Sequence, residues 1–161
     1  MSDNLSARFK QIMEEVVAYS TEHVHDGGIP FTAYVVDANG EILGRGVNRV
    51  LEHHDPTAHA EVEAIRDACR AVGAHHLQGT TLLASGEPCA MCYLNALFAG
   101  IDEVIYAVDR DDAAKAGFDY RGTYRMLAHF PDQWPMKVRK YTSSKALEPF
   151  NLWRKKGAFC E

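Results

Sequence analysis

Residues 59–61 read His-Ala-Glu, and residues 88–92 read Pro-Cys-Ala-Met-Cys. Each stretch stands at the start of a segment whose apolar spacing predicts a helix. Cysteines three residues apart share one face of a helix, so Cys89 and Cys92 can bind one metal ion. His59 adds an imidazole, and two thiolates with an imidazole favour zinc. Three protein ligands leave one tetrahedral position open, which is typical of a catalytic rather than a structural zinc site.

Glu61 is the candidate for proton transfer beside this metal. In the middle of a helix, residues two apart point roughly 200° away from each other. His59 and Glu61 can therefore converge only at a helix end, where side chains lean back toward the N-terminus. A helix that starts near residue 57 meets this condition. A carboxylate placed there can take a proton from water and pass it to a leaving group.

Each stretch alone has simpler explanations. A C-x-x-C pair also occurs in redox pairs and in structural metal half-sites, and an H-x-E triplet is common on any helix. The two stretches together, with 29 residues between His59 and Cys89 and a predicted strand before the second helix, favour one catalytic zinc per chain. Cys69 lies on the apolar face of its predicted helix and is expected in the core.

The order of expected elements predicts an α/β protein, a three-layer α/β/α domain with a five-stranded mixed sheet. The hairpin signal Asp37-Ala-Asn-Gly40 implies an antiparallel edge, and the later alternation of strands and helices implies a parallel section. One domain over residues 1–161 is expected, because this is a usual length for a single domain. The expected helices are 4–25, 57–72, 89–98, 111–116 and 146–156, and the expected strands are 31–37, 41–48, 80–84, 103–108 and 136–141.

Charge is spread unevenly along the chain. Seventeen Lys and Arg against 22 Asp and Glu give a net charge of −5, which argues against a general nucleic-acid binder. Residues 133–161 hold seven basic and two acidic residues, a local +5, so residues 1–132 carry −10. This basic segment also contains Phe150 and Trp153, so we expect it to pack on an acidic body, its own or a partner's.

No apolar run approaches the roughly 20 residues that a membrane helix needs. The first ten residues, MSDNLSARFK, lack the apolar core of a secretory signal. A cytoplasmic protein without a membrane partner is expected.

The combined pattern H-x-E … P-C-x-x-C resembles the zinc-dependent nucleobase deaminases of the cytidine-deaminase-like superfamily. The resemblance rests on residues 55–66 (DPTAHAEVEAIR), 87–92 (EPCAMC) and 112–119 (DAAKAGFD), and it extends over about residues 5–156. Cytosine, tRNA-adenosine and guanine deaminases share the first two motifs. The third motif is similar to that of the small bacterial guanine deaminases.

This resemblance implies a cytidine-deaminase-like fold and specific roles for residues. One Zn²⁺ per chain would be held by His59, Cys89 and Cys92, with Glu61 moving protons. The resemblance also implies a homodimer in which residues 133–161 cross to close the partner's pocket, with Glu148 or the residues from Phe159 onward near the partner's substrate. The substrate-binding residues that it implies are Asn48, Phe31, Ala60, Phe98, Asp119 and Glu148.

The sequence departs from the guanine-deaminase pattern at positions that affect specificity. Tyr120 stands where a second acidic residue is common, Phe98 where a Trp is common, and Gly86 where a small polar residue or Cys is common. The C-terminus reads Phe159-Cys160-Glu161 in place of the family's ending, in which an aromatic reaches the neighbouring pocket. The zinc motifs are intact.

The leading hypothesis is therefore a zinc-dependent hydrolytic deaminase that converts guanine to xanthine and ammonia. Guanosine, cytosine or an aminotriazine would require only a reshaped pocket. A tRNA adenosine deaminase is disfavoured by the net charge, because a polyanionic substrate requires basic contacts. A non-catalytic, zinc-stabilised interaction module is disfavoured by Glu61, which a structural site does not need.

Overall fold

The computed structural model describes residues 5–156. The chain divides into two compact units between Ala128 and His129, and each unit is described here by itself.

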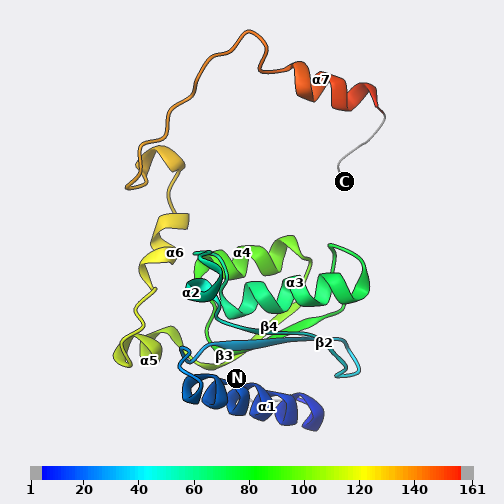
Figure 1. Cartoon of the computed structure of the whole chain (residues 1–161), viewed down its shortest axis with the longest axis vertical. Coiled ribbons are helices and arrows are strands. Elements are labelled where there is room, and N and C mark those ends of the chain that lie inside the picture. The colour runs from blue at the N-terminus through cyan, green and yellow to red at the C-terminus, as the bar shows by residue number, and fades with distance from the viewer. Residues whose placement is uncertain (1–4, 157–161) are drawn as a thin grey trace. The chain divides into compact units, whose positions relative to one another are not determined.

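The first unit has three layers, with helices on both faces of a mixed sheet (Figure 1). The sheet has four strands in the order β2-β1-β3-β4. β1 runs antiparallel to both β2 and β3, and β3 runs parallel to β4, so the predicted antiparallel edge and parallel section are confirmed. The strands are β1 Thr32–Val36, β2 Ile42–Val47, β3 Thr81–Gly86 and β4 Glu103–Val108.

The helices of this unit begin and end at recognisable signals. The side chain of Ser6 accepts a hydrogen bond from the N–H of Phe9 and caps the first helix. Gly73, in the left-handed conformation, ends the helix that carries Glu61. Two short helices, α2 and α6, were not expected from the sequence. The helices are α1 Ala7–His25, α2 Val50–His53, α3 Ala60–Val72, α4 Ala90–Phe98, α5 Arg110–Lys115 and α6 Gly122–Leu127.

Alternation along the strands divides the core between the two faces of the sheet. Ala33 and Val35 of β1 pack with α3 and α4 on one face. Tyr34 and Val36, the intervening residues, pack with Ile12 and Val16 of α1 on the other. Side chains two apart in a strand share a face, so one short strand supplies both halves of the core.

The helix α3 lies very close to β2. A Cβ added at Gly46 would lie 2.1 Å from the carbonyl oxygen of Ala60, and one at Gly44 would lie 2.4 Å from that of Ala64. The helix offers small side chains at Ala60, Ala64 and Ala68, all fully buried. The backbone of α3 therefore lies directly on β2, which places the N-terminus of α3 beside the end of that strand.

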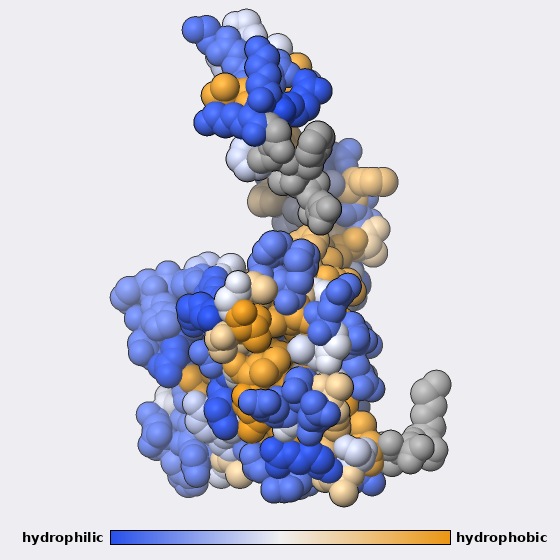
Figure 2. Space-filling view, turned by 90° about the vertical axis from the view of Figure 1, so that its right-hand side faces the viewer, coloured by the Kyte–Doolittle hydropathy of each residue, from blue (hydrophilic) through white to orange (hydrophobic). Residues whose placement is uncertain are grey.

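Apolar residues interrupt the polar surface of this unit. Figure 2 shows apolar side chains gathered among hydrophilic residues on one face. Leu97 and Phe98, at the C-terminal end of α4, are 70% and 78% exposed, and Leu51 of α2 is exposed as well. No helix among residues 5–156 is both long and apolar enough to cross a bilayer.

The second unit contains a short 3₁₀ helix, η1 (Pro131–Gln133), and one α-helix, α7 (Glu148–Lys155). The expectation of a fifth strand over residues 136–141 is wrong: these residues form no ladder, and the sheet has four strands within the described chain. Met136 and Val138, the apolar residues at the start of this segment, are 58% and 50% exposed. Alternation produces a strand only where a neighbouring edge accepts its hydrogen bonds.

We expect Gly46→Ala to lower the free energy of unfolding by about 1–3 kcal/mol, because the added methyl group would collide with the backbone of α3. Urea denaturation measures the change. Gly122→Ala is the matched control, since nothing lies within 4 Å of its added carbon and its stability should be unchanged or slightly raised. Equal effects of the two substitutions would contradict the close approach of α3 to β2.

Candidate active site

Two of the three predicted metal ligands occupy N-cap positions. α3 begins directly after His59 and α4 directly after Cys89, and neither side chain caps its own helix. The ring and the sulfur therefore remain available to a metal. Cys92 lies one turn further along α4 and is fully buried. Both helix N-termini are at the site, and their partial positive charge favours the thiolate form of cysteine.

The distances among the ligand atoms fit one tetrahedral ion. His59 Nδ1 lies 3.6 Å from Cys89 Sγ and 3.5 Å from Cys92 Sγ, and the two sulfurs are 3.6 Å apart. A zinc ion with bonds of about 2.3 Å to sulfur and about 2.0–2.1 Å to nitrogen would separate its ligands by about 3.5–3.8 Å. Among residues 5–156, these three form the group that can hold a metal.

The surroundings of Cys89 favour the thiolate form of its sulfur. The hydrogen bond with Cys92, together with the neighbouring His59 ring, lowers the pKa of the Cys89 thiol to about 4. The thiolate is the form that binds zinc.

Glu61 is the second residue of α3 and is only 5% exposed. Burial raises the pKa of its carboxyl group, because the charged form loses its hydration. A raised pKa makes the carboxylate a stronger base, which suits a group that takes up a proton and passes it on. The helix begins at Ala60 rather than near residue 57, and this later start brings His59 and Glu61 to the same end of α3, as the proton-transfer role requires.

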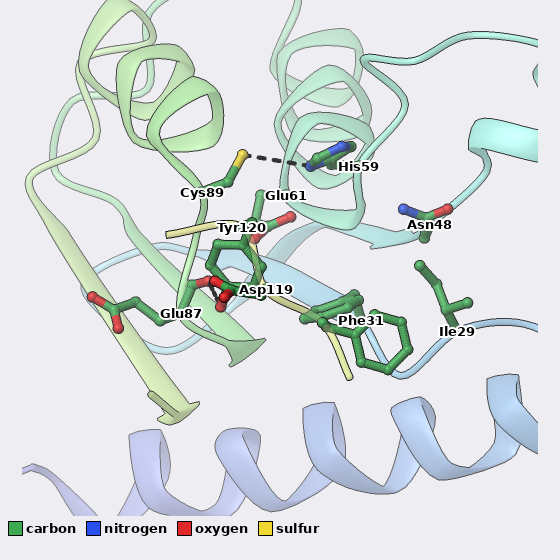
Figure 3. Close-up of a pocket in the computed structure, with 10 residues that line it drawn as sticks. Ile29, Phe31, Asn48, His59, Glu61, Glu87, Cys89, Asp119 and Tyr120 are labelled. Carbon is green, nitrogen blue, oxygen red and sulfur yellow. Dashed lines mark hydrogen bonds between the residues drawn. The ribbon is translucent and has the colours of Figure 1, made fainter. Parts of the chain in front are cut away.

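A cavity of about 270 Å³ lies beside the metal ligands (Figure 3). This volume is near the lower limit for small-molecule sites, roughly 300–1,000 Å³. Its apolar wall includes Phe31. The ring of Phe31 packs edge-on against Phe118 and Tyr120, with centroid separations of 5.2 Å and 6.2 Å. The lining residues are Ile29, Phe31, Asn48, His59, Glu61, Glu87, Cys89, Phe118, Asp119 and Tyr120.

The position of Phe31 depends on Gly86 at the end of β3. A Cβ added at Gly86 would lie 2.8 Å from Cε1 of Phe31. The aromatic ring therefore occupies the space that a side chain at position 86 would need.

The structure brings three of the six expected substrate-binding residues to the lining of this cavity. Asn48, Phe31 and Asp119 line it, and Ala60 is buried between the ligand His59 and Glu61. Their roles toward a substrate remain predictions.

Three other expectations concern residues elsewhere. Phe98 is 78% exposed on α4 and is not among the lining residues. Glu148 lies in the first turn of α7, in the second unit. The residues from Phe159 onward lie outside the described residues.

Sequence reasoning missed Ile29, Glu87, Phe118 and Tyr120 as lining residues. Glu87 and Phe118 lie inside the recognised motifs, so their proximity to assigned residues was the available signal. Tyr120 was noticed only as a departure from the family pattern.

A three-ligand zinc site with a buried carboxylate and a base-sized cavity defines the class of zinc-dependent hydrolases. Residues 7–108 match the family model of the cytidine and deoxycytidylate deaminase zinc-binding region. The chain belongs to this family and is a hydrolytic deaminase with a zinc cofactor.

Two comparisons extend beyond the zinc-binding region. A guanine deaminase of Bacillus subtilis is 38% identical over 143 residues, which are 88% of this chain and 91% of that protein. A crystal structure of guanine deaminase from Bacillus subtilis superposes with a TM-score of 0.87 at 35% identity, covering 98% of this chain and 99% of that one. A tRNA-specific adenosine deaminase of Aquifex aeolicus is 41% identical, but over 50% of this chain and 53% of its own length.

Cys89→Ser should reduce the zinc content from one ion per chain to nearly none and abolish activity, because two ligands hold the ion poorly. Elemental analysis of the purified protein measures the loss. Cys69→Ser, a partly buried cysteine of the same chain, should retain full zinc. Full zinc in Cys89→Ser would overturn the assignment.

Proposed function

We propose that this deaminase converts guanine and water to xanthine and ammonia. The observation that carries the proposal is the extent of the likeness to guanine deaminase, which includes the second unit as well as the zinc motifs. The likeness to the tRNA-specific adenosine deaminase of Aquifex aeolicus covers only about half of this chain. A cavity of about 270 Å³ also suits a free base better than a polymer.

The polar residues of the cavity support recognition of a purine edge. Arg121 donates to both carboxylate oxygens of Asp119 at 2.8 Å, and this hydrogen bonding lowers the pKa of Asp119 to about 2. Asp119 is therefore ionised and can only accept hydrogen bonds, which matches the ring N–H and amino group of guanine.

Asn48 complements this acceptor from the end of β2. Its Oδ1 accepts a hydrogen bond from the N–H of Val50, which orients the amide and presents Nδ2 as a donor to a ring nitrogen or carbonyl. Phe31 supplies an aromatic face. Ala60 is fully buried between His59 and Glu61, both of which line the cavity, and stays a substrate-binding candidate through its backbone. Phe98 and Glu148 remain candidates for substrate binding in the dimer proposed below, where they would contribute to a site completed by the partner.

The reaction breaks the C2–N bond of guanine and forms a C2–O bond. When bound, the zinc ion supplies a Lewis acid that activates water. Glu61 takes a proton from that water and delivers protons to the ring nitrogen and then to the departing amine. Glu61 is 5% exposed, and His59, Cys89 and Cys92 would hold the metal beside it.

We also propose that the protein is a homodimer. The whole chain forms one deaminase domain, and residues 133–161 of each subunit cross to the partner and complete its site. Phe150 and Trp153 share one face of α7 and are 67% and 49% exposed. Large apolar side chains on one stripe of a terminal helix are costly to expose. Leu97 and Phe98 offer an apolar surface on the first unit.

A reducing compartment such as the cytoplasm suits this site. Cys69, Cys89 and Cys92 are free thiols in the described chain, and disulfide-forming environments would oxidise the closely spaced pair.

Ammonia release from a panel of guanine, guanosine, cytosine, an aminotriazine and a tRNA anticodon stem-loop tests the proposed substrate. We expect turnover of guanine to exceed that of the others. Glu61→Gln is the matched control, because it keeps the side-chain shape and should keep zinc while losing at least about 10²-fold in kcat. Preferred turnover of another compound would disprove the guanine proposal, and near-normal turnover by the zinc-loaded variant would exclude Glu61 as the proton carrier.

Deletion of residues 147–161 tests the exchanged segment. We expect a monomer by light scattering, with a strongly raised KM and full zinc, because the metal ligands all lie in the first unit. Deletion of residues 157–161 alone separates the last residues from α7. A dimer with unchanged KM after the longer deletion would show that this segment neither joins the subunits nor closes the pocket.

A further inference from the structure

Two tyrosine hydroxyls bind the backbone of the turn that carries Cys89. The hydroxyl of Tyr120 donates to the carbonyl oxygen of Glu87 at 2.5 Å. The hydroxyl of Tyr124 donates to the carbonyl oxygen of Pro88, the next residue. Both peptide groups immediately before the metal ligand are thus held from outside the turn.

A third hydroxyl binds the backbone on the other side of Cys89. Thr123 Oγ1 accepts a hydrogen bond from the N–H of Ala90 at 3.2 Å and donates to the carbonyl oxygen of Tyr120 at 2.8 Å. Ala90 is the first residue of α4, and its N–H is one of the groups that a helix leaves without an internal partner. Cys89 occupies the N-cap but does not cap the helix, so Thr123 supplies this contact instead.

The two tyrosine rings are themselves held in place. The guanidinium carbon of Arg110 lies over the Tyr124 ring, 4.6 Å from its centroid. The centroid of the Tyr93 ring, on α4, lies 6.3 Å from that of Tyr124. Tyr120 packs against Cys89 and its neighbours in the small cluster around the metal ligands. Because the rings cannot move freely, the hydroxyls hold the turn to a defined position.

Arg110 braces the same turn through the side chain of Glu87. The backbone N–H of Arg110 donates to Glu87 Oε2 at 2.8 Å, and its guanidinium lies 3.4 Å from Oε1. Glu87 is 5% exposed, so this carboxylate would be costly to bury without such partners.

We propose that Tyr120, Thr123 and Tyr124, here called the hydroxyl clamp, are positioning residues that hold Cys89 in reach of the metal. His59 lies at the start of α3 and Cys89 in the turn between β3 and α4, so their separation depends on how firmly that turn is fixed. Ligand positions accurate to about 0.5 Å are needed for a well-formed site. The inference depends on the zinc site alone and not on which base is deaminated.

Removal of each hydroxyl in turn tests the hydroxyl clamp. The variants are Tyr120→Phe, Thr123→Val and Tyr124→Phe, each close in shape to the native residue. We expect more complete zinc transfer to a competing chelator, corresponding to a fall in zinc affinity of about tenfold or more, the effect typical of contacts that orient metal ligands. We also expect the absorption bands of the Co²⁺-substituted protein to shift, because the ligand geometry around the ion changes.

Two controls separate positioning from stability. Tyr19→Phe removes a hydroxyl from α1, on the opposite face of the sheet, and should leave zinc transfer unchanged. Ile12→Val lowers stability from the same helix without contacting the metal turn. The proposal would be overturned if all three clamp variants kept a zinc affinity within twofold of the parent protein and an unshifted Co²⁺ spectrum. It would also be overturned if Ile12→Val produced the same changes as the clamp variants. Neither measurement requires turnover, so failure of the guanine proposal would leave the result interpretable.

Discussion

The close contact between α3 and β2 is the constraint on which the site depends. Gly44 and Gly46 have no side chains, so the helix backbone can lie on the strand at a distance that any other residue would prevent. The start of α3 then falls beside the end of β2. Glu61 and His59, at the start of the helix, therefore meet Asn48, directly after the strand, within one cavity. The same contact between α3 and β2 therefore packs the core and positions the residues of the site.

The metal site uses helix ends in a way that costs local stability. A helix usually begins with a side chain that caps its own free N–H groups, and a missing cap costs about 1 kcal/mol. His59 and Cys89 hold cap positions without capping, because their ring and sulfur face the metal. α4 recovers part of this loss through Thr123, which is distant in sequence. In return for the missing caps, both ligands lie in the positive potential of a helix N-terminus.

Local patterns were sufficient to predict the four strands of the first unit and its zinc ligands. The boundaries of the four observed strands agree with the expected ones to within two residues, because alternation in Ala33 to Val36 reports two buried faces directly. The expected strand at 136–141 failed, because pairing depends on an edge elsewhere in the molecule. α6 and the cavity wall at Tyr120 were missed for a related reason. Tyr120 acts through a hydroxyl on a distant carbonyl group, and such a contact leaves no periodic trace in the sequence.

The contact between Gly86 and Phe31 has a consequence for how this enzyme's substrate range can change. The ring fills the volume of the missing side chain at position 86, so the two positions form one packing unit although they are 55 positions apart in the sequence. A larger residue at position 86 would drive the ring into the cavity and reduce the room for substrate. A smaller residue at position 31 alone would leave a void against β3. Evolution or engineering toward a different heterocycle would therefore have to change both residues together, and single substitutions at either one would pass through a less stable or narrower intermediate.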